Sequence, residues 1–461
     1  NNQKSDGKVV TEMLFCSEDF LFVFLPVFLL VYYLVPAKAK NLVLFLGSLW
    51  FYFTGEKVWF FLLMISLTLH YFLTRLMQGR KDGIRRGLLA VMLIYDFATL
   101  FIFKYVNFLF PKCKISLPLG ISFYTFQIAA YAIDVYRRPE EYTNNYINLG
   151  TYLCMFPQLI AGPIVLYGNV KRQMKKRVIG PENLETGLMV FVIGLTYKML
   201  IANILGSLWH EIQVAGIESI SSPMAWLGAL AYSLQLYFDF NGYSLMAMGL
   251  GTLLGFYLPR NFRQPYLAVS VTDFWRRWHI TLSTWFREYL YIPLGGNRKG
   301  TARTVANLLV VWAFTGMWHG AGWNFLLWGI YYFVFLVVEK FFLGEFWKKH
   351  PVFGWLYTML VVVTGWVIFS VEKLSDIGIY LKKMFIWSPG WNSNPGVTVS
   401  ALTRYGIFFV IAAVCATCLV ENIFRKNRDK LWLKGLLFVL FWICVYRIVT
   451  AASNPFLYFR F

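Results

Sequence analysis

Residues 21–35 read LFVFLPVFLLVYYLV, a run that contains no charged side chain. Mostly apolar runs follow at 42–53, 58–73 and 88–110, with only short polar breaks between them. About 20 mostly apolar residues cross the hydrocarbon layer of a membrane, and fewer are enough where aromatic side chains line its two surfaces. The chain has 18 Trp, 28 Tyr and 44 Phe to supply such aromatic belts. These runs therefore predict successive membrane-spanning helices.

The composition of the whole chain excludes a soluble globular protein. Hydrophobic residues make up 58% of the 461 positions and charged residues only 14%, against roughly 25% charged residues in ordinary soluble domains. A soluble chain of this length would lack the charged residues to cover its surface. We therefore predict an all-α polytopic membrane protein with about ten or more helical spans.

The positive charge indicates an orientation rather than a nucleic-acid partner. The net charge is +20, but the basic residues gather in short loops between apolar runs, which is typical of cytoplasmic loops. We therefore expect no nucleic acid among the partners and a lipid bilayer as the surroundings. Two other loops, 210–223 and 388–403, have no Lys or Arg and are predicted to lie outside. The basic clusters, all predicted to be cytoplasmic, lie at 75–86, 171–177, 260–303, 340–349 and 425–434.

Two segments do not fit simple crossings. The apolar stretch 149–166 lies between 134–142 and 171–177, which are both predicted to be cytoplasmic. A single span cannot begin and end on one side, so this stretch should enter the membrane and return. The basic segment 260–303 is broken by prolines and glycines, so we expect it to be re-entrant or interfacial. Irregular backbone at membrane depth is tolerated where protein buries it or water lines it, and the fold should therefore surround a cavity.

Ionisable groups at membrane depth are functional candidates, because burying them in hydrocarbon is costly. His319 lies in TGMWHG, residues 315–320, between two apolar stretches, and the glycines let backbone or ligand approach closely. An imidazole can serve as a general base, since its ordinary pKa is about 6.5. A structural role for this histidine remains the alternative. His70, His210 and His350 lie near the ends of predicted spans, where we expect them in the membrane interface.

Residues 274–279 read FWRRWH, with two arginines and a histidine between tryptophans. Arginine binds phosphate through two parallel hydrogen bonds, so Arg276 and Arg277 are predicted to bind a phosphate-bearing substrate. An interfacial helix whose arginines extend toward the lipid headgroups is an equally good interpretation.

A carboxylate and an amide interrupt the apolar run at 235–243, where Asp239 and Asn241 lie. Both are predicted to line the cavity and contact substrate, with a helix-break cap as the alternative. No metal site is predicted. Cys415 and Cys418 form a C-x-x-C pattern, which we interpret as packing residues inside an apolar helix.

Taken together, several motifs resemble the membrane-bound O-acyltransferase (MBOAT) family, and most closely its bacterial alginate O-acetyltransferase-like branch. The resemblance runs from 13 to 461 and implies one membrane domain, preceded by a polar leader at 1–12. It also implies a ring of about 11 transmembrane helices, with re-entrant segments around a central tunnel. The motifs lie at 117–124 (LPLGISFY), 157–163, 237–243, 274–291 (FWRRWHITLSTWFREYLY), 295–298 and 318–320.

The resemblance also assigns roles. His319 matches the catalytic histidine of the family and His279 matches its second histidine, while Trp318 is predicted to contact substrate. Tyr458 matches a C-terminal tyrosine implicated in carrying the acyl group, in a tail, 452–461, predicted to be extracytoplasmic. The charge of 425–434 supports that side independently, because one crossing follows it. An aromatic anchor in the membrane interface is the alternative for Tyr458.

The function implied is transfer of an acetyl group across a bacterial cytoplasmic membrane, for O-acetylation of a cell-envelope or extracellular polysaccharide. Acetyl-CoA is the expected acyl donor, and no bound cofactor is expected. The expected partners are the polysaccharide acceptor and an extracytoplasmic SGNH-type O-acetyltransferase. D-alanyl transfer to teichoic acid from a carrier protein is one alternative. A transporter or flippase without chemistry is another, although the internal repeats common in transporters are not evident.

Overall fold

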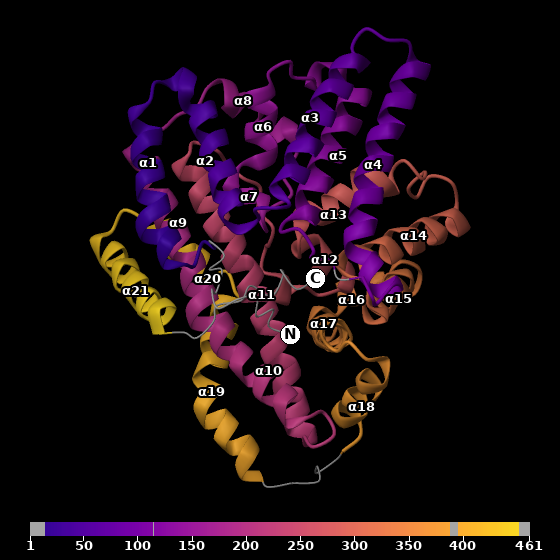
Figure 1. Cartoon of the computed structure of the whole chain (residues 1–461). Coiled ribbons are helices and arrows are strands. Elements are labelled where there is room, and N and C mark those ends of the chain that lie inside the picture. Colours follow the sequence, from indigo (N-terminus) through magenta and orange to yellow (C-terminus); the bar gives the residue numbers. More distant parts are fainter. Residues whose placement is uncertain (1–13, 114, 388–394, 451–461) are drawn as a thin grey trace. The chain divides into compact units, whose positions relative to one another are not determined.

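The computed structural model describes residues 14–113, 115–387 and 395–450, and within these ranges the chain folds into helices joined by loops, without strands (Figure 1). The described residues divide into two compact units. The first unit comprises 14–187, 246–258 and 445–450, and the second comprises 188–245, 259–387 and 395–444. The long helix α11 (Ser222–Leu253) contributes residues to both units.

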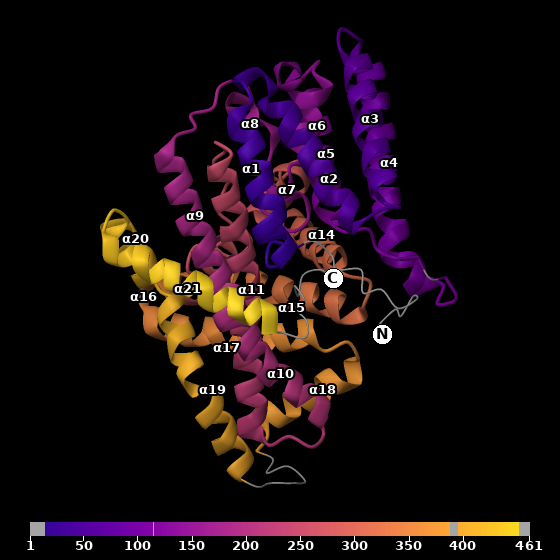
Figure 2. The same ribbon diagram turned by 60° about the vertical axis from the view of Figure 1, so that its left-hand side comes forward.

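The first unit begins with the helices that the apolar runs predicted. In Figure 2, α3 and α4 lie side by side as a helical hairpin. Helices α3, α4 and α6 pack against α5, most of which is buried. In chain order the elements are η1 (Asp19–Phe24), α1 (Leu25–Leu34), η2 (Ala37–Ala39), α2 (Lys40–Gly55), α3 (Phe60–Met77), α4 (Asp82–Leu109), α5 (Ile121–Arg137), η3 (Pro139–Glu141), α6 (Tyr146–Cys154), α7 (Phe156–Leu159), α8 (Tyr167–Lys175) and the first residues of α9 (Pro181–Thr196).

A buried polar pair links α3 to α4. The His70 Nε2 atom lies 3.0 Å from Asp96 Oδ2, and the other ring nitrogen lies 2.9 Å from the Ser66 carbonyl oxygen. Both side chains are almost fully buried. His70 is thus buried between two helices, and its position in the membrane interface stays a prediction. Its polar partner, Asp96, comes from the next helix, and the position of His70 along the chain gave no sign of that partner.

The stretch 149–166 has the broken form that a re-entrant path requires. Helix α6 ends at Cys154, and α7 adds only four residues before the backbone becomes irregular. Neither helix approaches the roughly 20 residues of a membrane span. The irregular backbone is buried against α5, since a Cβ at Gly120 would collide with the carbonyl oxygen of Leu159. This arrangement fits the prediction that the stretch enters the membrane and returns.

The second unit carries the long basic segment, and there the prediction of a broken path is confirmed. Between 260 and 303 the chain forms only short helices, separated by turns. In chain order the elements are the rest of α9, η4 (Tyr197–Ala202), α10 (Asn203–Ala215), most of α11, η5 (Pro265–Leu267), α12 (Val271–Arg277), α13 (Ile280–Phe286), η6 (Arg287–Tyr291), α14 (Thr301–His319), α15 (Trp323–Val338), η7 (Glu339–Leu343), α16 (Gly344–Lys349), α17 (Pro351–Ser370), α18 (Leu374–Phe385), α19 (Pro395–Cys415), α20 (Leu419–Asn427) and most of α21 (Leu431–Thr450).

The polytopic helical architecture is confirmed, although the count of about 11 spans is not established. Among the described residues, 7 helical segments are long and apolar enough to cross a membrane. They are Phe60–Met77, Asp82–Leu109, Pro181–Ala215, Trp323–Lys349, Pro351–Ser370, Gly396–Cys415 and Leu431–Thr450. A shorter apolar helix, Asp19–Leu34, matches the first predicted run.

The interpretation of Cys415 and Cys418 as packing residues inside one helix is wrong. Helix α19 ends at Cys415, and Cys418 is exposed in the turn before α20. The C-x-x-C pattern therefore spans a helix end, and only one of its two thiols is partly buried.

Candidate active site

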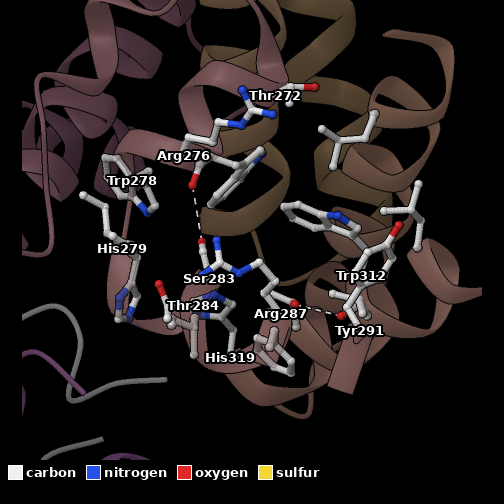
Figure 3. A pocket seen from close by; sticks show the side chains of 18 residues that line it. Thr272, Arg276, Trp278, His279, Ser283, Thr284, Arg287, Tyr291, Trp312 and His319 are labelled. Carbon is white, nitrogen blue, oxygen red and sulfur yellow. Dashed lines mark hydrogen bonds between the residues drawn. The ribbon is translucent and has the colours of Figure 1, made fainter. Parts of the chain in front are cut away.

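A cavity of about 420 Å³ lies among the short helices of the second unit. Its walls come from α12, α13, η6 and α14, with one residue of α15. Figure 3 shows His279 and His319 among its lining side chains, so the structure brings together the two histidines that the sequence assigned to one site. The lining residues are Thr272, Trp275, Arg276, Trp278, His279, Ile280, Leu282, Ser283, Thr284, Phe286, Arg287, Tyr291, Leu308, Val311, Trp312, Thr315, His319 and Leu336.

His319 is the last residue of α14 and is positioned by contact between α14 and α15. Two glycines make that contact possible. A Cβ at Gly316 would collide with the carbonyl oxygen of Phe325, and a Cβ at Gly329 would collide with that of Trp312. The two backbones therefore touch. The imidazole of His319 is 6% exposed and packs edge-on against Trp328, with ring centroids 5.1 Å apart. The ring is thus held by packing on a rigid pair of helices.

His279 precedes α13 and adopts a left-handed backbone conformation, with φ +42°. This conformation is uncommon for a residue other than glycine. The side chain is 2% exposed, and its Nδ1 atom lies 3.2 Å from Asn261 Oδ1. Burial lowers the pKa of His279 to about 3 because it disfavours the charged imidazolium. The ring is therefore neutral at physiological pH.

Trp318 connects the two histidines but does not line the cavity. Its ring centroid lies 6.0 Å from that of His279 and 4.9 Å from that of His319. The indole is 5% exposed. The structure thus places Trp318 behind the imidazoles, where it supports them. Trp318 is not among the residues that line the cavity, where its predicted contact with substrate would be made.

The two adjacent arginines of α12 differ in their surroundings. The Nε atom of Arg277 donates to Asp273 Oδ1 at 2.9 Å, one helical turn away. Arg276 lines the cavity and is exposed, and the described residues offer it no acidic partner. In Figure 3 its guanidinium lies well away from His319. Of the two predicted phosphate-binding arginines, only Arg276 faces the cavity.

Helix α12 is anchored at its first turn by a buried carboxylate. Glu339 Oε1 accepts a hydrogen bond of 2.6 Å from the Val271 amide. Its Oε2 accepts bonds of 2.8 and 2.7 Å from the amide and hydroxyl of Thr272. A carboxylate at a helix N-terminus satisfies amides that have no partner within the helix. Glu339 thereby holds the first turn of α12, the helix that carries Arg276.

Asp239 and Asn241 are not at the cavity. Asp239 Oδ1 lies 2.5 Å from the Nζ atom of Lys198, and both side chains are buried. Asn241 donates from Nδ2 to the hydroxyl of Tyr237 at 3.3 Å. Both residues lie inside α11, which continues unbroken to Leu253, so the alternative of a helix-break cap is wrong.

Three residues at or near the cavity were not singled out from the sequence. Arg287 lines it and lies within the quoted motif 274–291, so its place in that motif was a signal that could have been used. Asn261 and Glu339 reach the site from elements distant in the chain, so the sequence held no local signal for them. Tyr458 lies outside the described residues.

The fold and the cavity define a class: a multi-pass helical membrane protein with two buried histidines and an exposed arginine at one site. The MBOAT, membrane-bound O-acyltransferase family, model matches residues 137–378, which include the whole of this cavity. This match covers more than half of the chain. The chain therefore belongs to the membrane-bound O-acyltransferase family and is an O-acyltransferase.

Relatives with three different names share this sequence pattern. A probable alginate O-acetylase AlgI from Pseudomonas putida is 35% identical, covering 97% of this chain and 100% of the relative. A peptidoglycan O-acetyltransferase from Helicobacter pylori is 35% identical, covering 81% of this chain and 80% of the relative. A teichoic acid D-alanyltransferase from Bacillus subtilis is 29% identical, but the match covers only 48% of this chain and 60% of the relative. The resemblance to the alginate O-acetylase branch is thus confirmed over nearly the full chain.

Proposed function

We propose that this enzyme takes an acetyl group from acetyl-CoA on the cytoplasmic side of a bacterial cell membrane and passes it on for O-acetylation of a polysaccharide outside. The observation that carries the proposal is the cavity itself. His319 and Arg276 both line it, and in Figure 3 their side chains lie well apart. An elongated thioester with phosphates at one end and a reactive carbonyl at the other suits that separation. The names of the alginate and peptidoglycan relatives support acetyl as the group and a polysaccharide as the acceptor.

The chemistry follows from the side chains. The His319 imidazole removes a proton from the attacking hydroxyl, and the hydroxyl oxygen forms a bond to the thioester carbonyl carbon. The carbon–sulfur bond then breaks, and the imidazolium returns its proton to the CoA thiolate. Atoms and charge balance without any further reactant. Arg276 binds the phosphates of CoA through its guanidinium.

The attacking hydroxyl is assigned, as part of this proposal, to Tyr458. An acetyl-tyrosine splits one transfer into two easier steps, and a phenyl ester remains reactive enough to acylate a sugar hydroxyl. The ester is then consumed by an extracytoplasmic SGNH-type transferase. The charge of the loop 425–434 supports an external position for the chain end that follows α21.

Transfer of D-alanine to teichoic acid is the second candidate. It is supported by the match to the Bacillus subtilis D-alanyltransferase, which covers about half of each chain. The longer match to the alginate O-acetylase favours acetyl transfer.

A direct test uses the purified protein in lipid nanodiscs with acetyl-CoA labelled in the acetyl group. Release of free CoA thiol together with acetylated product, absent in His319→Ala, is the expected result. A D-alanyl carrier protein is the comparison donor. Turnover with that carrier but none with acetyl-CoA would favour D-alanylation, and no thioester cleavage with either donor would contradict both candidate functions.

A further inference from the structure

We propose that Asn261 is a positioning residue for His279: it fixes the imidazole as the tautomer protonated on Nδ1 and so makes Nε2 a hydrogen-bond acceptor for bound substrate. Asn261 lies in the loop between α11 and η5 and is 1% exposed. Nothing in its immediate sequence marks it as part of the site. The proposal deepens the proposed function, because it concerns the second histidine of the same cavity.

The orientation of the Asn261 amide is set by its neighbours. The backbone amide of Thr281 is an obligatory donor and points at Asn261 Oδ1 at 3.4 Å. The Thr281 hydroxyl donates to the same oxygen at 2.6 Å. On the other side, Asn261 Nδ2 donates to the hydroxyl of Ser244 at 3.2 Å. Exchanging the amide oxygen and nitrogen would place two donors against each other, so Oδ1 faces His279.

The tautomer of His279 follows from that orientation. Since Oδ1 can only accept, the Nδ1 atom at 3.2 Å must carry the proton. In a neutral imidazole the other nitrogen, Nε2, then holds the lone pair. Such a nitrogen accepts a hydrogen bond from a hydroxyl or an amide N–H of a bound substrate.

Asn261 also stabilises the backbone that presents the ring. Its carbonyl oxygen accepts the amide of Ile280 at 2.9 Å, directly after the left-handed residue His279. One residue thus binds the ring and the first two residues of α13. A strained backbone conformation persists only where its surroundings hold it in place, and Asn261 supplies that support.

The surroundings of the ring keep it neutral. Phe240 from α11 packs against it with ring centroids 4.7 Å apart, and Trp318 from α14 lies on another side. Its Nδ1 atom faces the amide of Asn261, which does not titrate, and the hydroxyl of Thr281 binds the same amide oxygen. Burial among these rings is the cause of its lowered pKa.

The first test reads the tautomer without requiring activity. Solid-state NMR of protein labelled with ¹⁵N-histidine, reconstituted in lipid, resolves protonated from unprotonated ring nitrogens, and His279→Gln assigns the signal. We expect Nδ1 protonated and Nε2 bare from pH 5 to pH 8. An Nε2–H tautomer or an imidazolium in this range would overturn the proposal. Because no acyl donor is present, failure of the proposed function leaves this measurement intact.

The second test separates positioning from stability. Asn261→Asp keeps the acceptor for Nδ1 but adds a negative charge, which raises the pKa of His279. Below the raised pKa the ring is cationic and Nε2 no longer accepts, so acyl transfer should gain an acidic limb that recovers as pH rises. Ser244→Ala is the matched control: it removes only the partner of Nδ2, while the amide and hydroxyl of Thr281 still hold Oδ1 toward His279, so tautomer and pH profile should stay unchanged. An Asn261→Asp profile identical to wild type would contradict the proposal.

Discussion

Lys198 and Asp239 form an ion pair in the interior of the second unit, with Nζ 2.5 Å from Oδ1 and both side chains 2% exposed. Lys198 lies in the π-helical turn η4, and Asp239 lies in α11. The two elements touch closely there, because a Cβ at Gly242 of α11 would lie 3.1 Å from the backbone nitrogen of Lys198. Asp239 therefore balances a buried charge.

We expect Asp239→Asn to destabilise the protein by about 3–5 kcal/mol, because Lys198 is left buried without its counter-charge. The double variant Lys198→Met/Asp239→Leu should recover most of that loss, since it removes both charges together. Thermal unfolding in detergent compares the three proteins. If the double variant is no more stable than Asp239→Asn, the charge balance is not what holds these helices together.

His319→Ala should lower the rate of acyl transfer by roughly 10²- to 10⁴-fold, the usual loss when a general base is removed. His350→Ala is the matched control, because His350 is exposed at the start of α17 and away from the cavity residues. Turnover of labelled acetyl-CoA measures both. A folded His319→Ala protein with near-normal turnover would remove this residue from the mechanism.

Arg276→Gln should raise the KM for the CoA thioester much more than Arg277→Gln does. Arg276 faces the cavity, while Arg277 is held by Asp273. For Arg277→Gln we expect mainly a small loss of stability of about 0.3–0.5 kcal/mol, typical of a helical pair one turn apart. Steady-state kinetics with acetyl-CoA and with a truncated thioester lacking phosphates separates the two roles. Equal effects of both substitutions on both donors would exclude a special role for Arg276.

Glu339→Ala should loosen α12 and weaken donor binding without removing any group that lines the cavity. The substitution leaves the amides of Val271 and Thr272 without their acceptor, at about 1–3 kcal/mol for each buried donor. Glu339→Gln keeps one acceptor oxygen and should retain part of the stability. Amide hydrogen exchange over 271–277 reports the anchoring, and unchanged exchange in Glu339→Ala would show that α12 does not depend on it.

Tyr458→Phe should block acetylation of the polysaccharide while thioester binding persists. The substitution keeps the aromatic ring and removes only the nucleophilic oxygen, so an interface anchor would tolerate it. Mass spectrometry of the C-terminal peptide after incubation with acetyl-CoA should show one acetyl group in wild type and none in the variant. If Tyr458→Phe acetylates the polysaccharide at the wild-type level, Tyr458 does not carry the acyl group and serves only as an interface anchor.

The sequence predicted best what depends on local chemistry. The helices α1 to α4 match the first apolar runs, because length and apolarity alone determine a membrane span. The broken course of 260–303 was likewise evident from its prolines and glycines. The difference between Arg276 and Arg277 was also available, since Asp273 precedes Arg277 by one helical turn.

Partners brought together only by tertiary packing could not be predicted. Asp239 looked like a cavity residue because its counter-ion, Lys198, lies in another helix. Asn261 and Glu339 support the site across long stretches of chain, through hydrogen bonds that no sequence spacing indicates. A charged residue in an apolar run signals that a partner exists, but it does not say whether that partner is a substrate or another side chain.

The contact of α14 with α15 through Gly316 and Gly329 has a mechanical consequence. At these two glycines the backbones meet directly, with no side chain between them that could compress or slide. We expect the two helices to move as one rigid pair, with His319 at the end of α14. The short helices α12 and α13 are instead joined by turns at Trp278 and His279. We therefore expect any widening of the cavity to come from movement of these two short helices, while α14 and α15 hold His319 in place.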